Sequence, residues 1–261
     1  AEKGLQAFFM GADFEYTDAI HGITSSSALI GCIIGSAVSG FFASGLGRKN
    51  SLFLAGILFF LSALGSYYPE FLFFEHGVPS YSLLVAFNFY RVLGGIGVGL
   101  ASAICPMYIA EIAPSNIRGT LVSWNQFAII FGQLVVYFVN FLILGSHANP
   151  VIDLVNGVNQ IMNPEAAAWT TETGWRLMFV SEAVPAGLFA LLVLLVPETP
   201  RYLAMCGKDE RALNVLSRIN GASQAKVILA EIKATTEEKT ERLFTYGWMV
   251  IFIGIMLSVF Q

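Results

Sequence analysis

Two charged residues, Arg91 and Glu182, stand inside long apolar stretches of the sequence, 81–103 and 176–196. A charge within a membrane-spanning helix is costly and commonly faces a partner or a water-filled path. At the usual rise per residue, Arg91 lies about 15 Å along its helix from Tyr81, and Glu182 lies about 9 Å along its helix from Arg176. At these similar depths the two charges could pair or share a third charge. They could mark a path for a transported solute, which we favour, or form a static buried ion pair.

Three amide side chains recur at intervals of seven in another apolar stretch: Gln126, Gln133 and Asn140. This spacing keeps them on one face of a helix. An amide group both donates and accepts hydrogen bonds, which suits a solute that carries many hydroxyl groups. Hydrogen bonding between neighbouring helices explains the pattern about equally well.

Charged residues of both signs stand where apolar stretches end. They are Arg48, Lys49, Glu111, Arg118, Glu198 and Arg201. If these ends meet on one side of a membrane, the charges could form a network that closes in one conformation and opens in another. The alternative is that they only fix the orientation of the chain and cap its helices.

The elements that hold these residues follow from the composition. Of the 261 residues, 56% are hydrophobic and only 12% are charged, against about 25% in average soluble proteins. Too few charges remain to coat a water-facing surface, which argues against a soluble enzyme or a disordered chain. The net charge of -4 offers no basic surface for nucleic acid. The sequence therefore predicts an all-α polytopic membrane protein.

Five apolar stretches have the length that a spanning helix requires. We expect helices near 24–46, 51–68, 81–103, 119–145 and 176–196, and the start of another at 246. Lys and Arg gather in the segments 47–50, 111–118 and 198–245, which the positive-inside rule places in the cytoplasm, with residue 1 outside.

The chain is expected to comprise three parts. These are an N-terminal transmembrane bundle over 1–200 that lacks its first helix, cytoplasmic amphipathic linker helices over 201–245, and a truncated first helix of a C-terminal bundle over 246–261. The apolar spacing of Ala212, Val215, Leu216 and Ile219 predicts the first of the linker helices.

Other motifs point to packing and not to chemistry. Small residues at Gly31, Gly35, Gly95 and Gly99 favour close contact between helices. The three cysteines lie far apart and show no metal spacing, and the three histidines fall in or beside outer loops. We therefore expect no metal and no cofactor.

Several motifs resemble those of the sugar porter family of the major facilitator superfamily. They are PMYIAE at 106–111 followed by Arg118-Gly119, PETPR at 197–201, and Gly47-Arg48-Lys49. The stretches 91–102 and 124–140 are most similar to bacterial D-xylose–proton symporters. One departure is Ser44-Gly45, where the family's loop motif has an acidic or amide residue followed by a basic one.

The resemblance implies twelve helices that work by alternating access around a central site, of which this chain holds helices two to six and the start of seven. It implies sugar binding by Gln126, Gln133 and Gln261. It also implies proton coupling by Arg91 and Glu182 beside an acid on an absent first helix. Arg48, Glu111, Arg118, Glu198 and Arg201 would form the cytoplasmic gate network.

These observations predict transport of a monosaccharide, D-xylose first, together with protons across the inner membrane by a monomeric protein in the lipid bilayer. A facilitative sugar uniporter and a non-transporting sugar sensor remain alternatives. A membrane enzyme is less favoured, because the sequence offers no nucleophile–base pair and no metal constellation.

Overall fold

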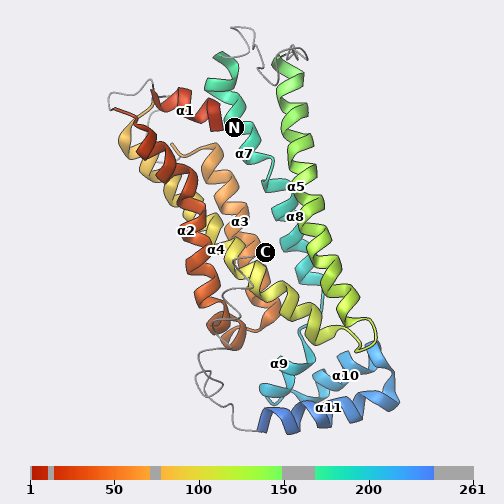
Figure 1. The fold of residues 1–261 in the computed structure, drawn as a ribbon. Coiled ribbons are helices and arrows are strands. Elements are labelled where there is room, and N and C mark those ends of the chain that lie inside the picture. Colours follow the sequence, from red (N-terminus) through yellow and green to blue (C-terminus); the bar gives the residue numbers. More distant parts are fainter. Residues whose placement is uncertain (1, 11–14, 71–77, 149–167, 238–261) are drawn as a thin grey trace, which may run out of the picture. The chain divides into compact units, whose positions relative to one another are not determined.

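The computed structural model describes residues 2–10, 15–70, 78–148 and 168–237. Within these ranges every regular element is a helix (Figure 1). The chain divides into two units, Ala1–Thr199 and Pro200–Gln261, and each is described by itself.

Five segments of the first unit are long and apolar enough to cross a membrane. They are Asp18–Gly45, Arg48–Tyr67, Tyr81–Ile112, Arg118–Gly145 and Thr171–Leu195. The first three are α2, α3 and α4; α5 runs over Arg118–Ala148; the last contains η1 (Thr170–Gly174), α7 (Trp175–Val180) and α8 (Ala183–Leu195). The five predicted spans are confirmed, and the chain is a multi-pass membrane protein.

The central helix of the bundle is α4, which packs against α2 on one side and α3 on another, while α8 lies along α3 (Figure 1). The glycines permit this close packing. A Cβ atom at Gly95 would lie 2.0 Å from the carbonyl oxygen of Ala28, and one at Gly99 would lie 2.3 Å from that of Cys32. The small-residue stripes therefore pack α2 against α4, as the sequence predicts.

Helix α4 is longer than its sequence predicts, because it continues past 103 to Ile112 with Pro106 inside it. Proline removes one helical hydrogen bond and usually ends or kinks a helix. Here Ile104 is fully buried in a core that also contains Leu52 and Leu100. Side-chain packing thus continues the helix through the proline.

The predicted helix over 176–196 is interrupted. α7 ends at Val180 and α8 begins at Ala183, with Ser181 and Glu182 in a turn between them. Pro185 accounts for the break, because it has no N–H group for the carbonyl of Ser181 and its ring crowds that carbonyl. Glu182 therefore lies at a turn between two helices inside this span.

A short helix that the sequence did not predict, α1 (Glu2–Met10), covers one end of the bundle. Its Phe8 and Phe9 are buried in an aromatic core with Phe87 and Trp175. Helix α2 then begins after Thr17, whose hydroxyl accepts a hydrogen bond from the Ile20 N–H group.

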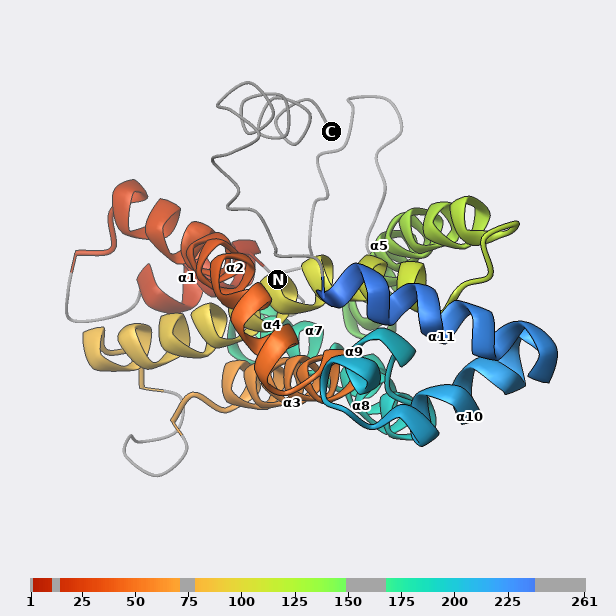
Figure 2. The same ribbon diagram turned by 90° about the horizontal axis from the view of Figure 1, so that it is seen from below.

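The second unit contains α9 (Pro200–Met205), α10 (Asp209–Asn220) and α11 (Ala222–Glu237), which pack together (Figure 2). Ala212, Leu216 and Ala225 are buried. Lys233 of α11 forms an ion pair with Asp209 at the start of α10. Helix α10 lies where the apolar spacing of Ala212, Val215, Leu216 and Ile219 predicts a helix.

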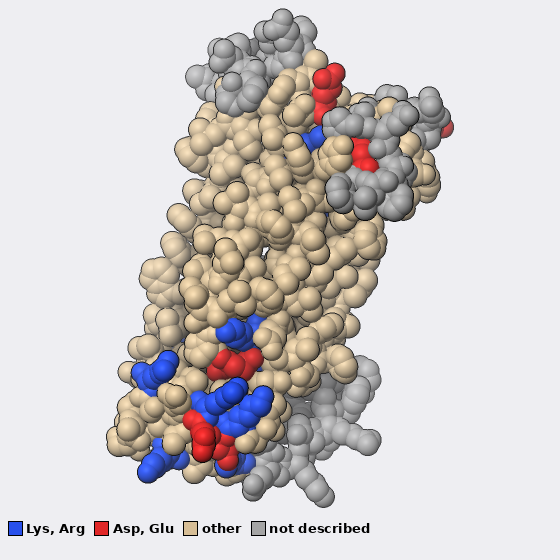
Figure 3. All heavy atoms as spheres, turned by 180° about the vertical axis from the view of Figure 1, so that it is seen from behind, with Lys and Arg blue, Asp and Glu red and all other residues tan. Residues whose placement is uncertain are grey.

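Seen from behind, the middle of the helical bundle carries a broad surface without charged side chains (Figure 3). An uncharged belt of this kind is what contact with lipid chains requires.

Candidate functional site

Arg48 and Glu111 form a buried ion pair between the start of α3 and the end of α4. The Nη2 atom of Arg48 lies 2.8 Å from Oε1 of Glu111, and only 9% and 10% of the two side chains are exposed. The Nη1 group of Arg48 also donates to the carbonyl of Ala43 at 3.2 Å, the end of α2. One guanidinium thus joins the ends of three helices.

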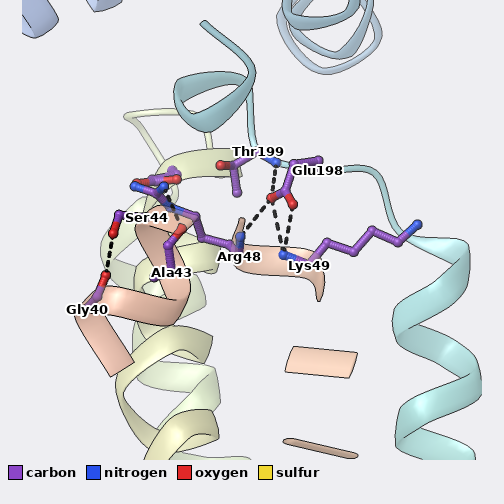
Figure 4. A network of polar contacts seen from close by, with 8 residues as sticks. Gly40, Ala43, Ser44, Arg48, Lys49, Glu198 and Thr199 are labelled. Atoms are coloured by element: carbon purple, nitrogen blue, oxygen red, sulfur yellow. Dashed lines mark hydrogen bonds and ion pairs between the residues drawn. The ribbon is translucent and has the colours of Figure 1, made fainter. Parts of the chain in front are cut away.

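Glu198 caps α3 from a distant part of the chain (Figure 4). Its carboxylate accepts hydrogen bonds from the backbone N–H groups of Arg48 and Lys49 at 3.1 to 3.2 Å, and from that of Thr199 at 2.9 Å. Gly47 precedes the helix and has no side chain with which to cap it. A carboxylate at a helix N-terminus also interacts favourably with the helix dipole.

Two further residues complete this cluster: Lys49, which the sequence places among the charges at helix ends, and Tyr108, which the sequence reasoning did not single out. The Nζ group of Lys49 donates to the carbonyl of Leu194 at 2.8 Å, and the hydroxyl of Tyr108 donates to that of Pro197 at 2.7 Å. Both residues stand inside the motifs quoted above, and this position was the signal in the sequence that could have indicated their role. They fasten the end of α8 to α3, and the segment that follows α8 to α4.

The structure does not join every residue of the predicted gate network. Arg118 donates to the carbonyl of Ala113 at 3.4 Å, and in the described residues no ion pair links it to Glu111. Arg201 lies in the other unit, so its part in the network stays a prediction. The hydroxyl of Ser44, at the departure from the family motif, donates to the carbonyls of Gly40 and Phe41 in its own helix.

Arg91 and Glu182 are brought together in the bundle. Arg91 of α4 lies close enough to Glu182, between α7 and α8, for its positive charge to act on the carboxylate. The Cζ atom of Arg91 lies 5.2 Å from the centroid of the Phe179 ring, within cation–π range. Arg91 is half-buried and Glu182 is exposed in this chain.

The amide face of α5 is open. Gln126 and Gln133 are exposed, and within the described part of the chain neither has a hydrogen-bond partner. The buried Oδ1 atom of Asn140 has no partner there either. Helix α5 touches α4 and α7, so this face belongs to the same bundle as Arg91. Gln261 lies outside the described residues.

A bundle of membrane-spanning helices with buried charge and an open amide face is typical of a secondary transporter. The model of the sugar (and other) transporter family matches residues 5–261. The chain belongs to this family, which is a family of transporters and not of enzymes.

The relatives include the D-xylose-proton symporter of Escherichia coli, which is 45% identical over 253 residues, 94% of this chain and 48% of that protein. The glucose facilitated diffusion protein of Zymomonas mobilis is 31% identical over 93% of this chain and 48% of its own length. The chain thus spans about half the length of these relatives.

Solved structures give the same picture. The E. coli xylose transporter in a partially occluded inward-open conformation matches with a TM-score of 0.81 at 42% identity, over 99% of this chain and 57% of that one. The major facilitator superfamily proton:xylose symporter bound to 6-bromo-6-deoxy-D-glucose gives 0.84 at 42% identity, over 99% and 53%. The first unit therefore has the fold of a partial major facilitator bundle.

Proposed function

We propose that this chain forms much of the N-terminal half of a monosaccharide–proton symporter of the cytoplasmic membrane, with D-xylose as its sugar. The observation that carries the proposal is the position of Arg91 over Phe179, close to Glu182, in the bundle that also presents the open amide face of α5. A named proton symporter of D-xylose at 45% identity supports both the coupling ion and the sugar.

Sugar hydroxyls would bind Gln126 and Gln133, and Gln261 would join them from the opposite half. Each amide offers a carbonyl acceptor and two N–H donors, so it can pair with a hydroxyl in either direction. Because both glutamines are exposed in this chain, they can meet a ligand without breaking an existing contact.

Proton coupling would act through Arg91. A proton taken up by an acid near this guanidinium removes the attraction between them and frees Arg91 to strengthen its interaction with Glu182. The change in charge then biases the bundle between its two conformations.

The end of the bundle that holds Arg48, Glu111 and Glu198 would be cytoplasmic, with 201–245 as the linker between the two halves of a monomer. The ion pair and the cap at this end would hold the two-conformation gate closed, with Arg118 and Arg201 as further members. Opening the gate must break bonds that are buried in this structure.

Sugar binding to the purified full-length transporter tests the proposal. Gln133→Ala and Gln126→Ala should each weaken D-xylose binding about tenfold or more, because each removes a hydrogen-bonding group (about 1.4 kcal/mol per tenfold). Ser123→Ala is the matched control, since this α5 hydroxyl bonds to Gly119 of its own helix. Unchanged affinity in both glutamine variants would contradict the site.

Two other functions are outcomes of the same assays. A facilitative uniporter, the kind of protein that the Zymomonas relative is named as, moves sugar without proton movement. A sugar sensor binds without flux.

A further inference from the structure

A second buried ion pair lies at the end of the bundle opposite the Arg48–Glu111 pair. Arg176, at the start of α7, is bidentate to Glu70: Nη1 donates to Oε2 at 2.7 Å, and Nη2 pairs with Oε1. Nη1 also donates to the carbonyl of Tyr67 at the end of α3, 3.1 Å away. The exposed fractions of the two side chains are 4% and 0%. We call this pair the Glu70–Arg176 clasp.

Aromatic rings enclose the clasp on the other sides. The Cζ atom of Arg176 lies 4.7 Å from the Trp175 ring and 5.3 Å from the ring of Phe8 in α1. The clasp therefore connects the start of α7 to the end of α3 and to α1, at one end of the bundle (Figure 1). A planar guanidinium with two parallel bonds fixes orientation as well as position.

The same aromatic cluster extends from the clasp to Arg91. Trp175 is fully buried and contacts Phe87 and Phe179, with ring centroids 5.8 Å and 6.2 Å away. Phe179 follows Trp175 by one helical turn, so both rings lie on one face of α7. The guanidinium of Arg91 stacks on Phe179 at 5.2 Å.

Helix α7 is short and is separated from α8 by the break at Ser181 and Glu182. Pro185 removes one hydrogen bond between α7 and α8, so the two helices are joined less firmly than two turns of one regular helix. The contacts at the other end of α7 therefore help to fix its rotation, and the bidentate clasp is the most directional of those among the described residues. A rotation of α7 would move Phe179 and the backbone of Glu182 together.

We propose that the Glu70–Arg176 clasp is a positioning device for the Arg91–Glu182 pair. By fixing α7 it holds Phe179 beneath Arg91 and Glu182 within reach of that charge. Glu70 and Arg176 touch neither sugar nor proton; they act through Phe179. The inference rests on the proposed function, because it assigns the clasp a part in proton coupling.

Proteoliposomes of the full-length transporter test this with two readouts, protons taken up per D-xylose and sugar counterflow without a proton gradient. Glu70→Gln keeps the shape of the side chain but removes the charge. We expect counterflow within about twofold of wild type, proton-driven accumulation at least about tenfold lower, and a displaced pH profile of uptake. Phe179→Leu leaves the clasp in place and should give the same pattern.

Glu172→Gln is the matched control, since Glu172 is an exposed carboxylate on η1, in the same span. It should change neither readout. A purely structural clasp would lower counterflow and accumulation together in Glu70→Gln, and that result overturns the proposal. Wild-type proton coupling in the Phe179→Leu variant would also overturn the proposal. This second variant provides the test if Glu70→Gln does not reach the membrane. Failure of the wild-type protein to couple sugar to protons would instead contradict the proposed function itself.

Discussion

Both carboxylate oxygens of Glu198 lie 3.2 Å from the backbone nitrogen of Lys49, 149 positions away in the sequence. The Glu198 side chain thus bonds the backbone at the start of α3, and not the charged side chain of Lys49. This contact explains why a glycine is tolerated as the residue before α3: the acceptor that Gly47 cannot supply comes from beyond α8.

Removing this acceptor should destabilise the bundle. Glu198→Ala leaves two N–H groups at the start of α3 without their acceptor, so we expect a loss of about 2 kcal/mol, with a smaller loss for Glu198→Gln, which keeps one oxygen. Thermal unfolding of the purified full-length protein measures both. Glu210→Gln, an exposed carboxylate in the first turn of α10, is the control and should have little effect. Equal stability of Glu198→Ala and wild type would refute the capping role.

Removing one partner of the Arg48–Glu111 pair should destabilise the protein more than removing both partners together. Arg48→Ala leaves the Glu111 carboxylate buried without its counter-charge, for which we expect a loss of about 3 to 5 kcal/mol. Arg48→Lys keeps the charge but cannot reach both Glu111 and the Ala43 carbonyl with one amine, so it should rescue only in part.

A double-mutant cycle checks this prediction. Arg48→Ala combined with Glu111→Ala should be less destabilised than the sum of the single variants. Arg118→Ala combined with Glu111→Ala is the control cycle and should give additive losses. The Arg118 guanidinium donates to the Ala113 carbonyl at 3.4 Å and forms no ion pair with Glu111 in the described residues. Additive losses in the cycle would show that the pair does not act as a unit.

The contact of α2 with α4 depends on the missing side chain of Gly95. Gly95→Ala would place a Cβ atom 2.0 Å from the Ala28 carbonyl oxygen, and main-chain atoms of a helix cannot easily move away. We expect the variant to separate the two helices, with loss of folded protein in detergent on size-exclusion chromatography. Gly132→Ala on α5 meets nothing within 4 Å and should behave as wild type. Normal folding of Gly95→Ala would contradict the packing.

The features that the sequence predicts well are local ones. The spans follow from runs of apolar residues, and the helix contacts from glycines at helical spacing, because both patterns are complete within one helix. Arg91 and Glu182 were visible because charge is rare in such runs. The structure places them close enough for their charges to interact, and whether they pair or share a third charge stays a prediction.

Other features depend on partners far away in the chain. Glu70 follows an apolar stretch and Arg176 begins one, so each reads as an ordinary helix-end charge until the fold brings them together. Helix α1 is stabilised by Trp175 and Phe87, which no local pattern reveals. A proline inside an apolar run is a local signal of a weak point, so Pro185 marks the turn beside Glu182, but the extent of the break depends on packing at both of its ends.

The central claim, proton-coupled sugar transport through Arg91, is tested most directly by adding D-xylose to proteoliposomes of the full-length transporter and recording external pH. We expect xylose entry to make the medium more alkaline, and Arg91→Cys to abolish this alkalinisation while sugar still binds. Sugar entry without a pH change in the wild-type protein, or full alkalinisation in Arg91→Cys, would contradict it.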